Sequence, residues 1–243
     1  MKITLLIPMY NERAIIADTL SEVSSFMKET FREDYEILFV NDGSHDGCEE
    51  AVSSFPDGAV RLVTYPENRG KGYAIRRGVE EARGEVIFFT DCDLAYGCRV
   101  IPEFYEILAA ADAPDVAVGS RDLHPEGYDG YTLLRKLVSR AYLFVLRLFG
   151  GLRLSDSQCG CKGFRADTGK RIFSYCEVDR FAFDLEAILI GQKMGATFCE
   201  VPVKVLRHGE SKVRIVRDTL RMLRDLRKMK KRIKGLNLDE VTK

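Results

Sequence analysis

Short apolar runs alternate with amphipathic segments along the first half of this chain. Five runs have the length and composition of buried strands: Ile3–Pro8, Glu36–Val40, Val60–Tyr65, Val86–Thr90 and Asp115–Gly119. Four segments between them have helical periodicity: Arg13–Lys28, Asp46–Phe55, Tyr73–Ala82 and Val100–Ala111. This alternation is typical of βαβ units. It predicts an α/β fold in which helices flank a mostly parallel sheet.

The pattern changes after Gly119. The second half reads as a long helix, a Gly/Ser/Cys-rich loop, a helix, a strand and a basic helix: Thr132–Phe149, the loop, Phe183–Met194, Thr197–Leu206 and the C-terminal stretch. A chain of 243 residues suits one large domain with an appended tail. We therefore predict one large α/β domain over 1–212 and a basic amphipathic helix and tail over 213–243.

Bulk composition excludes several classes of protein. The 37 basic and 37 acidic residues give a net charge of zero, which does not favour nucleic acid as a partner. Seven cysteines, an odd number, indicate a reducing compartment rather than a disulfide framework. The N-terminal apolar stretch is too short for a signal peptide, and no segment is long enough to span a membrane. These features predict a cytoplasmic protein.

Two aspartates, Asp91 and Asp93, directly follow the run Val86–Thr90. In open α/β sheets, ligands bind beyond the carboxyl ends of the strands. Two carboxylates one residue apart offer the hard oxygen ligands that Mg²⁺ or Mn²⁺ takes, with water and substrate phosphates filling the other positions. The pair therefore predicts a metal site. The alternative is a pair at the start of a loop that caps the next helix.

Other strand ends also carry polar residues. The first strand ends in Pro-Met-Tyr-Asn-Glu, residues 8–12, and lacks the GxGxxG motif of dinucleotide-binding domains. Asp42 follows the second strand, where it could accept hydrogen bonds from a base or a ribose. Two glycines surround Lys71 at a helix start, an arrangement that lets backbone N–H groups approach a phosphate. Together these segments predict a crevice for a nucleoside diphosphate.

The motifs P-x-Y-N-E, V-N-D-G-S, N-x-G-K-G-x-A and D-C-D, in this order, resemble those of family 2 glycosyltransferases. Later segments are similar to the polyprenyl-phosphate branch of that family, which contains dolichyl-phosphate mannose synthases and dolichyl-phosphate β-glucosyltransferases. These segments are Gly119–Arg121, Arg135 with Ser139, Asp156–Lys162, Phe183–Glu186 and Gly209–Lys212. The resemblance runs from Ile3 to Lys212, and D-S-Q-C-G-C-K and F-A-F-D-L-E are closer to the glucosyltransferase type.

The resemblance implies a GT-A (Rossmann-like) fold and inverting transfer of a hexose from a nucleotide sugar to a polyprenyl phosphate. UDP-glucose is the expected donor and Mg²⁺ or Mn²⁺ the expected cofactor. The alternatives are GDP-mannose-dependent transfer to a polyprenyl phosphate, transfer to a soluble acceptor, and a catalytically idle nucleotide-sugar-binding module. A lipid phosphate is already anionic, so it needs positioning by arginines more than it needs a strong base.

The same resemblance assigns roles to individual residues. The metal ligands are Asp91 and Asp93. The nucleotide-sugar-binding residues are Pro8, Tyr10, Glu12, Asp42, Lys71, Asp91, Cys92, Asp93 and Gln158. The catalytic residues are Asp93, Asp156, Arg121 and Arg135. The acceptor-phosphate residues are Arg121, Arg135, Ser139, Arg207 and Lys212. Asp184 and Glu186 lie one residue apart on a predicted helix, so their side chains diverge by about 200° and only one should face the site.

Two segments suggest contact with a membrane. Thr132–Phe149 mixes apolar and basic residues, which fits an interfacial helix and burial against the sheet equally well. Near the C-terminus, an apolar stripe runs through Val216, Leu220, Leu223, Leu226, Met229 and Ile233. Ten basic and two acidic residues between Val213 and Lys234 give a local net charge of about +8, which favours an anionic membrane surface.

The resemblance implies membrane spans beyond this point in many relatives, whereas this sequence ends at Lys243. We therefore expect an enzyme that is peripherally associated with the cytoplasmic face of a membrane. A separate membrane-protein partner and a homo-oligomer both stay open as partners. Nucleic acid is the weaker interpretation of the basic helix, because the whole chain has no net charge.

Overall fold

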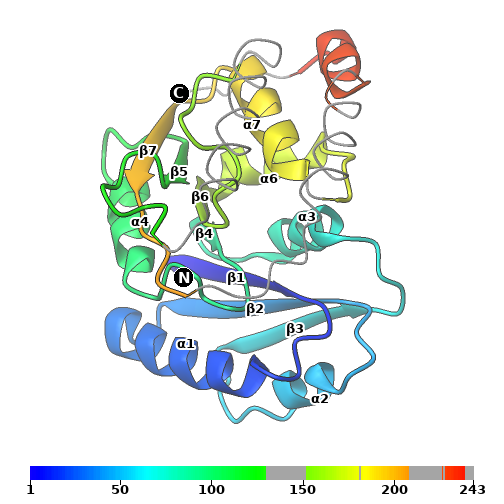
Figure 1. Cartoon of the computed structure of the whole chain (residues 1–243), viewed down its shortest axis with the longest axis vertical. Helices are drawn as coiled ribbons and strands as arrows, with labels where there is room; N and C mark the ends of the chain where they lie inside the picture. Colours follow the sequence, from blue (N-terminus) through cyan, green and yellow to red (C-terminus); the bar gives the residue numbers. More distant parts are fainter. Residues whose placement is uncertain (130–151, 181, 208–225, 227, 239–243) are drawn as a thin grey trace.

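The computed structural model describes residues 1–129, 152–180, 182–207, 226 and 228–238. Seven strands form one sheet in the order β3-β2-β1-β4-β6-β5-β7 (Figure 1). The strands are β1 (Ile3–Met9), β2 (Tyr35–Asp42), β3 (Val60–Tyr65), β4 (Val86–Phe89), β5 (Val116–Ser120), β6 (Lys162–Arg165) and β7 (Phe198–Pro202). The helices are α1 (Ile16–Phe31), α2 (Cys48–Ser53), α3 (Lys71–Glu81), α4 (Val100–Ala109), α6 (Ala166–Ser174) and α7 (Phe183–Lys193).

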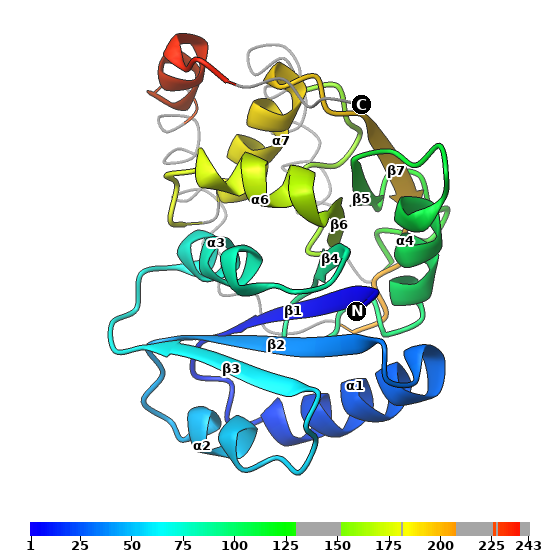
Figure 2. The ribbon, with the colours of Figure 1, turned by 180° about the vertical axis from the view of Figure 1, so that it is seen from behind.

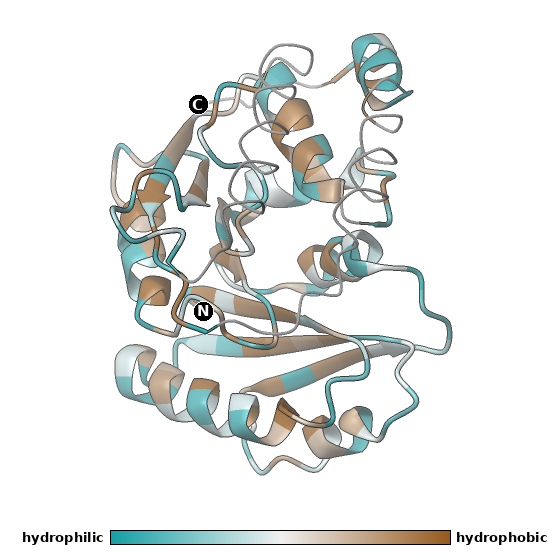
Figure 3. Cartoon of the chain, in the orientation of Figure 1, coloured by the Kyte–Doolittle hydropathy of each residue, from teal (hydrophilic) through white to brown (hydrophobic). Residues whose placement is uncertain are grey.

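Both faces of the sheet are covered, because successive side chains of a strand point to opposite faces. In β1, Leu6 belongs to the same hydrophobic core cluster as residues of α3, α6 and α7, whereas Leu5 and Ile7 belong to the cluster that contains residues of α1 and α4. The buried strands are therefore almost continuously apolar, as expected for parallel strands between two helical layers. Figure 2 shows the two layers from behind, and Figure 3 shows the hydrophobic strands between them.

The mostly parallel sheet is confirmed. β3, β2, β1 and β4 run parallel, and so do β5 and β7, while β6 is antiparallel to both of its neighbours. The five strands predicted in the first half are all present. Neither β6 nor α6 was predicted from the sequence. In the case of β6, the sequence Lys-Gly-Phe-Arg has no apolar run that would indicate a strand. The predicted helix Thr132–Phe149 lies outside the described residues.

A buried polar network ties the strands together at the amino end of β2. Glu36 is 1% exposed and accepts from the Thr4 hydroxyl at 2.6 Å. Its carboxylate also accepts from Arg61 Nη1 at 2.6 Å and from the N–H of Arg83 at 2.6 Å. Because every oxygen of this carboxylate has a donor, its burial is compensated. The network lies at the end of the sheet opposite the strand ends that carry the predicted site.

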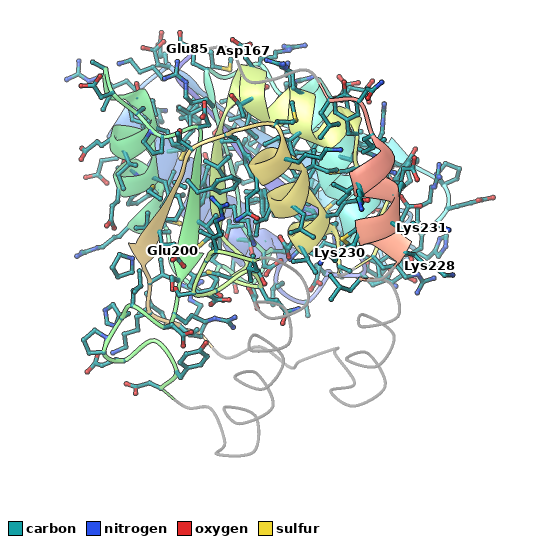
Figure 4. All side chains as sticks on the ribbon, turned by 90° about the horizontal axis from the view of Figure 1, so that it is seen from above. Glu85, Asp167, Glu200, Lys228, Lys230 and Lys231 are labelled. Carbon is teal, nitrogen blue, oxygen red and sulfur yellow. The ribbon has the colours of Figure 1, made fainter. Side chains whose placement is uncertain are left out.

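Residues 228–235, here called the C-terminal helix, form the last described helix (Figure 1). Leu226, Met229 and Ile233 from the predicted stripe are buried in the same core as α6 and α7. This part of the stripe therefore packs on the protein itself. Lys228, Lys230 and Lys231 are exposed and lie together at the rim of the molecule (Figure 4). The rest of the helix predicted over 213–243 lies outside the described residues.

We find no helix among the described residues with the length and hydropathy needed to cross a membrane.

Candidate functional site

The turn that follows β4 carries the Asp91–Asp93 pair. α1 fixes its backbone, because the Thr19 hydroxyl donates to the carbonyl oxygen of Cys92 at 2.8 Å. Asp93 Oδ1 accepts from the N–H of Ala95 at 3.1 Å. The pKa of Asp93 is raised, first because its carboxyl group is buried and then because the charge of Asp91 lies close by. The two carboxylates are therefore near neighbours at the carboxyl end of β4.

Two lysines supply positive charge beside this pair. Lys71, the first residue of α3, forms an ion pair with Asp91. Burial alone would lower the pKa of Lys71, but the carboxylates of Asp91 and Asp184 raise it. Lys162 is 1% exposed, and its ammonium group donates to Asp184 Oδ1 at 2.8 Å and to the carbonyl oxygen of Cys159 at 2.6 Å. Three carboxylates thus surround two ammonium groups, which leaves an excess of negative charge.

The loop over 155–161 passes directly against Asp91. A Cβ atom on Gly160 would lie closer than 3.0 Å to Asp91 Oδ2 and 3.3 Å from its Cγ. The N–H of Gly160 also donates to the Tyr96 hydroxyl at 3.3 Å. Glycine is therefore the residue that lets this loop approach the carboxylate without displacing it.

Arg121 and Asp156 form a bidentate ion pair. Arg121 Nε donates to Asp156 Oδ2 at 2.6 Å, and Nη2 donates to Oδ1 at 3.0 Å. Burial opposes ionisation of Asp156, but the Arg121 guanidinium lowers the pKa of that carboxyl group. The N–H of Gln158 donates to Asp156 Oδ1 at 3.0 Å, and Glu200 of β7 (Figure 4) accepts from the N–H of Ser155 at 2.7 Å. The roles predicted for Arg121, Asp156 and Gln158 stay predictions, and in this structure Asp156 orients Arg121.

The end of β1 lies next to the turn after β4 (Figure 1). The pKa of the Cys92 thiol is raised to about 12, first by burial and then by the charge of Glu12. Glu12 also contributes to the raised pKa of Asp93. Tyr10 is 39% exposed, and Pro8 lies within β1. The structure therefore brings Glu12 and Cys92 to the aspartate pair.

Asp42 holds the loop that leads into α3. Its Oδ1 accepts from the N–H of Arg69 at 2.8 Å, and its Oδ2 accepts from the N–H of Gly70 at 2.8 Å. The Asn68 amide donates to the same Oδ2 at 2.8 Å. Asp42 therefore has a structural role in this loop, and its contact with a base or a ribose stays a prediction.

The phosphate-binding interpretation of the two glycines is wrong in its backbone part. The N–H groups of Gly72 and Tyr73 donate to the carbonyl oxygen of Asp179 at 2.8 and 3.2 Å, and that of Gly70 is bonded to a carboxylate. A Cβ atom on Gly70 would lie 2.5 Å from Asp179 O, and one on Gly72 would clash with Val178 O. The glycines are required by this close approach, and binding of a phosphate by the Lys71 ammonium stays a prediction.

The acceptor residues are only partly placed. Arg135, Ser139 and Lys212 lie outside the described residues. Arg207 is half-exposed, and its Nη2 donates to Glu22 at 2.8 Å. This bond is the main reason why the pKa of Arg207 is raised, and the charge of Asp93 adds to the effect. The charges of Arg207 and Asp93 are therefore close enough to interact weakly.

The prediction that only one acidic residue of α7 faces the site is confirmed. Asp184 pairs with Lys162, whereas Glu186 accepts from the N–H groups of Glu177 and Val178 at 2.9 and 2.8 Å. Lys162 and Gly160 were missed as site residues. Both residues belong to the segment Asp156–Lys162, which resembles the family motif, and this segment is the sequence feature that could have indicated them.

The residues at the aspartate pair fit a divalent cation. Oxygen ligands from adjacent carboxylates are the type that Mg²⁺ and Mn²⁺ bind. The pKa of Asp93 is raised first by burial of its carboxyl group and then by the neighbouring charge of Asp91, and a bound cation would offset both effects. No three side chains of His, Cys, Asp or Glu come together as a metal-binding group in the described part of the chain.

The mostly parallel sheet, with acidic residues after β4, is a GT-A glycosyltransferase fold. Solved structures of glucosyl-3-phosphoglycerate synthase from Mycobacterium tuberculosis have this fold. The complex with Mn²⁺, UDP and glucosyl-3-phosphoglycerate superimposes with a TM-score of 0.71 at 17% identity, covering 97% of this chain and 81% of that one. The complex with Mn²⁺, UDP-glucose and phosphoglyceric acid gives a TM-score of 0.70 at 18% identity, with the same coverage. The chain belongs to glycosyl transferase family 2, whose pattern matches residues 4–173.

Curated relatives are similar over most of this chain. A dolichyl-phosphate beta-glucosyltransferase of Trichomonas vaginalis is 33% identical over 226 residues, which is 87% of this chain and 66% of the relative. The enzyme of the same name from Drosophila melanogaster is 30% identical over 242 residues, with 93% and 73% covered. That of Homo sapiens is 29% identical over 241 residues, with 93% and 74% covered. The chain thus spans about two thirds to three quarters of these relatives.

Proposed function

We propose that this chain is an inverting hexosyltransferase that moves glucose from UDP-glucose to a polyprenyl phosphate. The observation that carries the proposal is the cluster of Asp91, Asp93 and Lys71 beneath the loop that contains Gly160. Relatives at 29 to 33% identity are named dolichyl-phosphate beta-glucosyltransferases, which supports the acceptor and the sugar. The Mycobacterium tuberculosis structures with UDP and Mn²⁺ support a uridine nucleotide and a divalent metal.

On the donor side, Asp93 with Asp91 would hold Mg²⁺ or Mn²⁺, which supplies Lewis-acid stabilisation of the departing diphosphate. Lys71 adds a positive charge beside the same carboxylates, and Lys162 fixes Asp184 behind it. A divalent metal would more than offset the single excess carboxylate of this cluster, which favours binding of the anionic diphosphate. These residues therefore bind and neutralise the leaving group rather than transfer protons.

On the acceptor side, an oxygen of the lipid phosphate forms a bond to the anomeric carbon as the bond from that carbon to the diphosphate breaks. The attacking oxygen is already anionic, so no strong base is required. Arginine is suited to hold such a phosphate in position. Arg121 is oriented by Asp156, and Arg207 is close enough to Asp93 for their charges to interact weakly, so both are proposed acceptor contacts.

We assign the enzyme to the cytoplasmic face of a membrane, to which it binds peripherally. Exposed lysines of the C-terminal helix support this assignment, because each basic charge near an anionic surface contributes about 1 kcal/mol. A separate membrane protein or a second copy of the chain could share this surface.

A donor panel tests the proposal. Purified protein is incubated with undecaprenyl or dolichyl phosphate, Mg²⁺ or Mn²⁺, and UDP-glucose, GDP-mannose or other nucleotide sugars, and lipid-linked product is measured. We expect product from UDP-glucose and its loss on chelation. Asp93→Asn should lower kcat/KM by about 100-fold or more, because a group that stabilises developing charge is removed. Asp34→Asn, at an exposed ion pair with Lys2, is the matched control and should be unchanged.

The alternatives give different results. Product from GDP-mannose alone would identify a mannosyltransferase, and transfer only to water-soluble acceptors would refute the lipid acceptor. No turnover with any donor, together with an unaltered glycan profile in cells carrying Asp93→Asn, would indicate an idle binding module.

A further inference from the structure

The C-terminal helix is attached to α7 at two points. Arg232 forms an ion pair with Glu186 and donates to the carbonyl oxygen of Tyr175 at 3.0 Å. The Lys193 ammonium, at the end of α7, donates to the carbonyl oxygens of Ile233 and Leu236 at 2.6 and 2.7 Å. Ile233 lies in the last turn of the helix, where carbonyl oxygens lack the usual partner four residues on, and Leu236 directly follows the helix. The helix is therefore held in one position relative to α7.

Glu186 connects this helix to the segment 175–180. Its side chain is fully buried, and Arg232 is its cationic partner. Its Oε2 accepts from the N–H groups of Glu177 and Val178 at 2.9 and 2.8 Å. A buried carboxylate that loses its cation must rearrange or become protonated. Any such change would pass directly to these two backbone N–H groups.

The segment 175–180 in turn supports the turn that carries Lys71. The carbonyl oxygen of Asp179 accepts from the N–H of Gly72 at 2.8 Å, and Asp179 Oδ1 pairs with Arg76 of α3 at 2.5 Å. The backbone approach is so close that Gly70 and Gly72 have no room for a Cβ atom. Because these contacts lie on both sides of Lys71, they fix its backbone next to Asp91.

We propose that Arg232 is a positioning residue for donor binding. Through Glu186 it holds the segment 175–180 against the turn 70–73, and so it sets the position of the Lys71 ammonium beside Asp91. The C-terminal helix is then a structural part of the donor site as well as a basic surface. The proposal rests on the proposed function in one respect, namely that Lys71 binds the diphosphate of a nucleotide sugar.

Arg232→Gln in the full chain tests this inference with two readouts. Hydrogen exchange of the amides at 70–74 should become about tenfold faster, which corresponds to about 1.4 kcal/mol less protection against local opening. KM for the nucleotide sugar should rise about tenfold, while KM for the lipid phosphate and kcat change by less than about threefold. Arg232→Lys should restore part of both effects, because an ammonium can still pair with Glu186.

Glu177→Gln is the matched control. Glu177 also pairs with Arg232, at 3.3 Å, but its side chain is 71% exposed, so both readouts should stay at wild-type values. Arg76→Met removes the ion pair between Arg76 and Asp179, which also holds the segment 175–180 against α3, and it leaves Glu186 paired with Arg232. Arg76→Met should show the same faster exchange at 70–74 and the same rise in donor KM. If Arg232→Gln does not fold, Arg232→Lys decides, and it should show smaller changes in the same direction in both readouts.

Unchanged exchange at 70–74 in a folded Arg232→Gln protein would overturn the inference, and so would unchanged exchange in Arg76→Met. Exchange depends on the contacts alone. If the wild-type protein makes no lipid-linked sugar but Arg232→Gln exchanges faster at 70–74, the proposed function is wrong and the positioning role of Arg232 stands.

Discussion

Replacing Gly160 by alanine should lower catalytic activity while leaving the stability of the fold almost unchanged. The new Cβ atom would lie closer than 3.0 Å to Asp91 Oδ2 and 3.3 Å from Asp91 Cγ. To restore ordinary contact distances the carboxylate must move by roughly 1 Å. Asp91 is 37% exposed and can turn toward solvent, so the cost to folding is small. The same movement breaks the alignment of Asp91 with Lys71, and with the metal ion that we propose it binds.

We expect Gly160→Ala to lower kcat/KM by about 100-fold, the effect of a misplacement of this size at a reacting centre. That loss corresponds to about 2.7 kcal/mol of transition-state stabilisation. Affinity for UDP in the presence of Mn²⁺, measured by calorimetry, should fall in parallel. The melting temperature should stay within a few degrees of wild type, because a loss below about 1 kcal/mol shifts it little.

Gly58→Ala is the control, since nothing lies within 4 Å of the added Cβ atom. It should leave activity, UDP affinity and melting temperature unchanged. A Gly160→Ala enzyme with wild-type kcat/KM and wild-type metal dependence would show that Asp91 does not hold the metal. A variant that unfolds would show instead that the loop is packed far more tightly than these distances indicate.

Two further predictions concern stability. Glu36→Ala should lower the free energy of unfolding by about 3 kcal/mol, because Arg61 loses its buried partner. The kcat should not change, since the Glu36 network lies away from the site. Urea denaturation measures the first effect, and an activity assay measures the second. Asp156 has a lowered pKa, so its ionised form contributes stability that is present above the ordinary carboxyl value of about 3.9 and is lost as the pH falls through the lower native value. Asp156→Asn should therefore be less stable at pH 7 and show a smaller further loss between about pH 4 and pH 2; an equally steep acid loss in the variant would contradict this origin.

Sequence patterns predicted the parts of the fold that depend on local hydrophobicity. The run Val86–Thr90 became β4 (Val86–Phe89), with its aspartates at the carboxyl end, because a buried parallel strand must be apolar on both faces. β6 could not be predicted in the same way. Its Lys162 is charged and yet buried, and the position is tolerated only because Asp184 and the carbonyl oxygen of Cys159 compensate the charge. Those partners are distant in sequence or lie in an irregular loop.

The residues of the candidate site were likewise predicted only where the local sequence determines their role. The aspartate pair and Lys71 were predicted because the carboxyl ends of neighbouring parallel strands converge. The role of Gly70 and Gly72 was not, since a glycine required by a passing backbone has the same local sequence as one required by a phosphate. The carbonyl oxygens of Val178 and Asp179 that decide between these roles come from more than 100 residues further along the chain.

The position of β6 has a consequence for synthesis of the chain on the ribosome. β4 and β5 are successive strands, yet β6, made more than 40 residues after β5, separates them in the sheet. Until residues 162–165 emerge, β4 has an unpaired hydrogen-bonding edge in the nascent chain, and exposed edges of this kind invite pairing with other chains. Long-range pairing also slows folding. Arrested nascent chains that end before β6 should therefore be the species most dependent on chaperones, and those that include it should resist proteolysis.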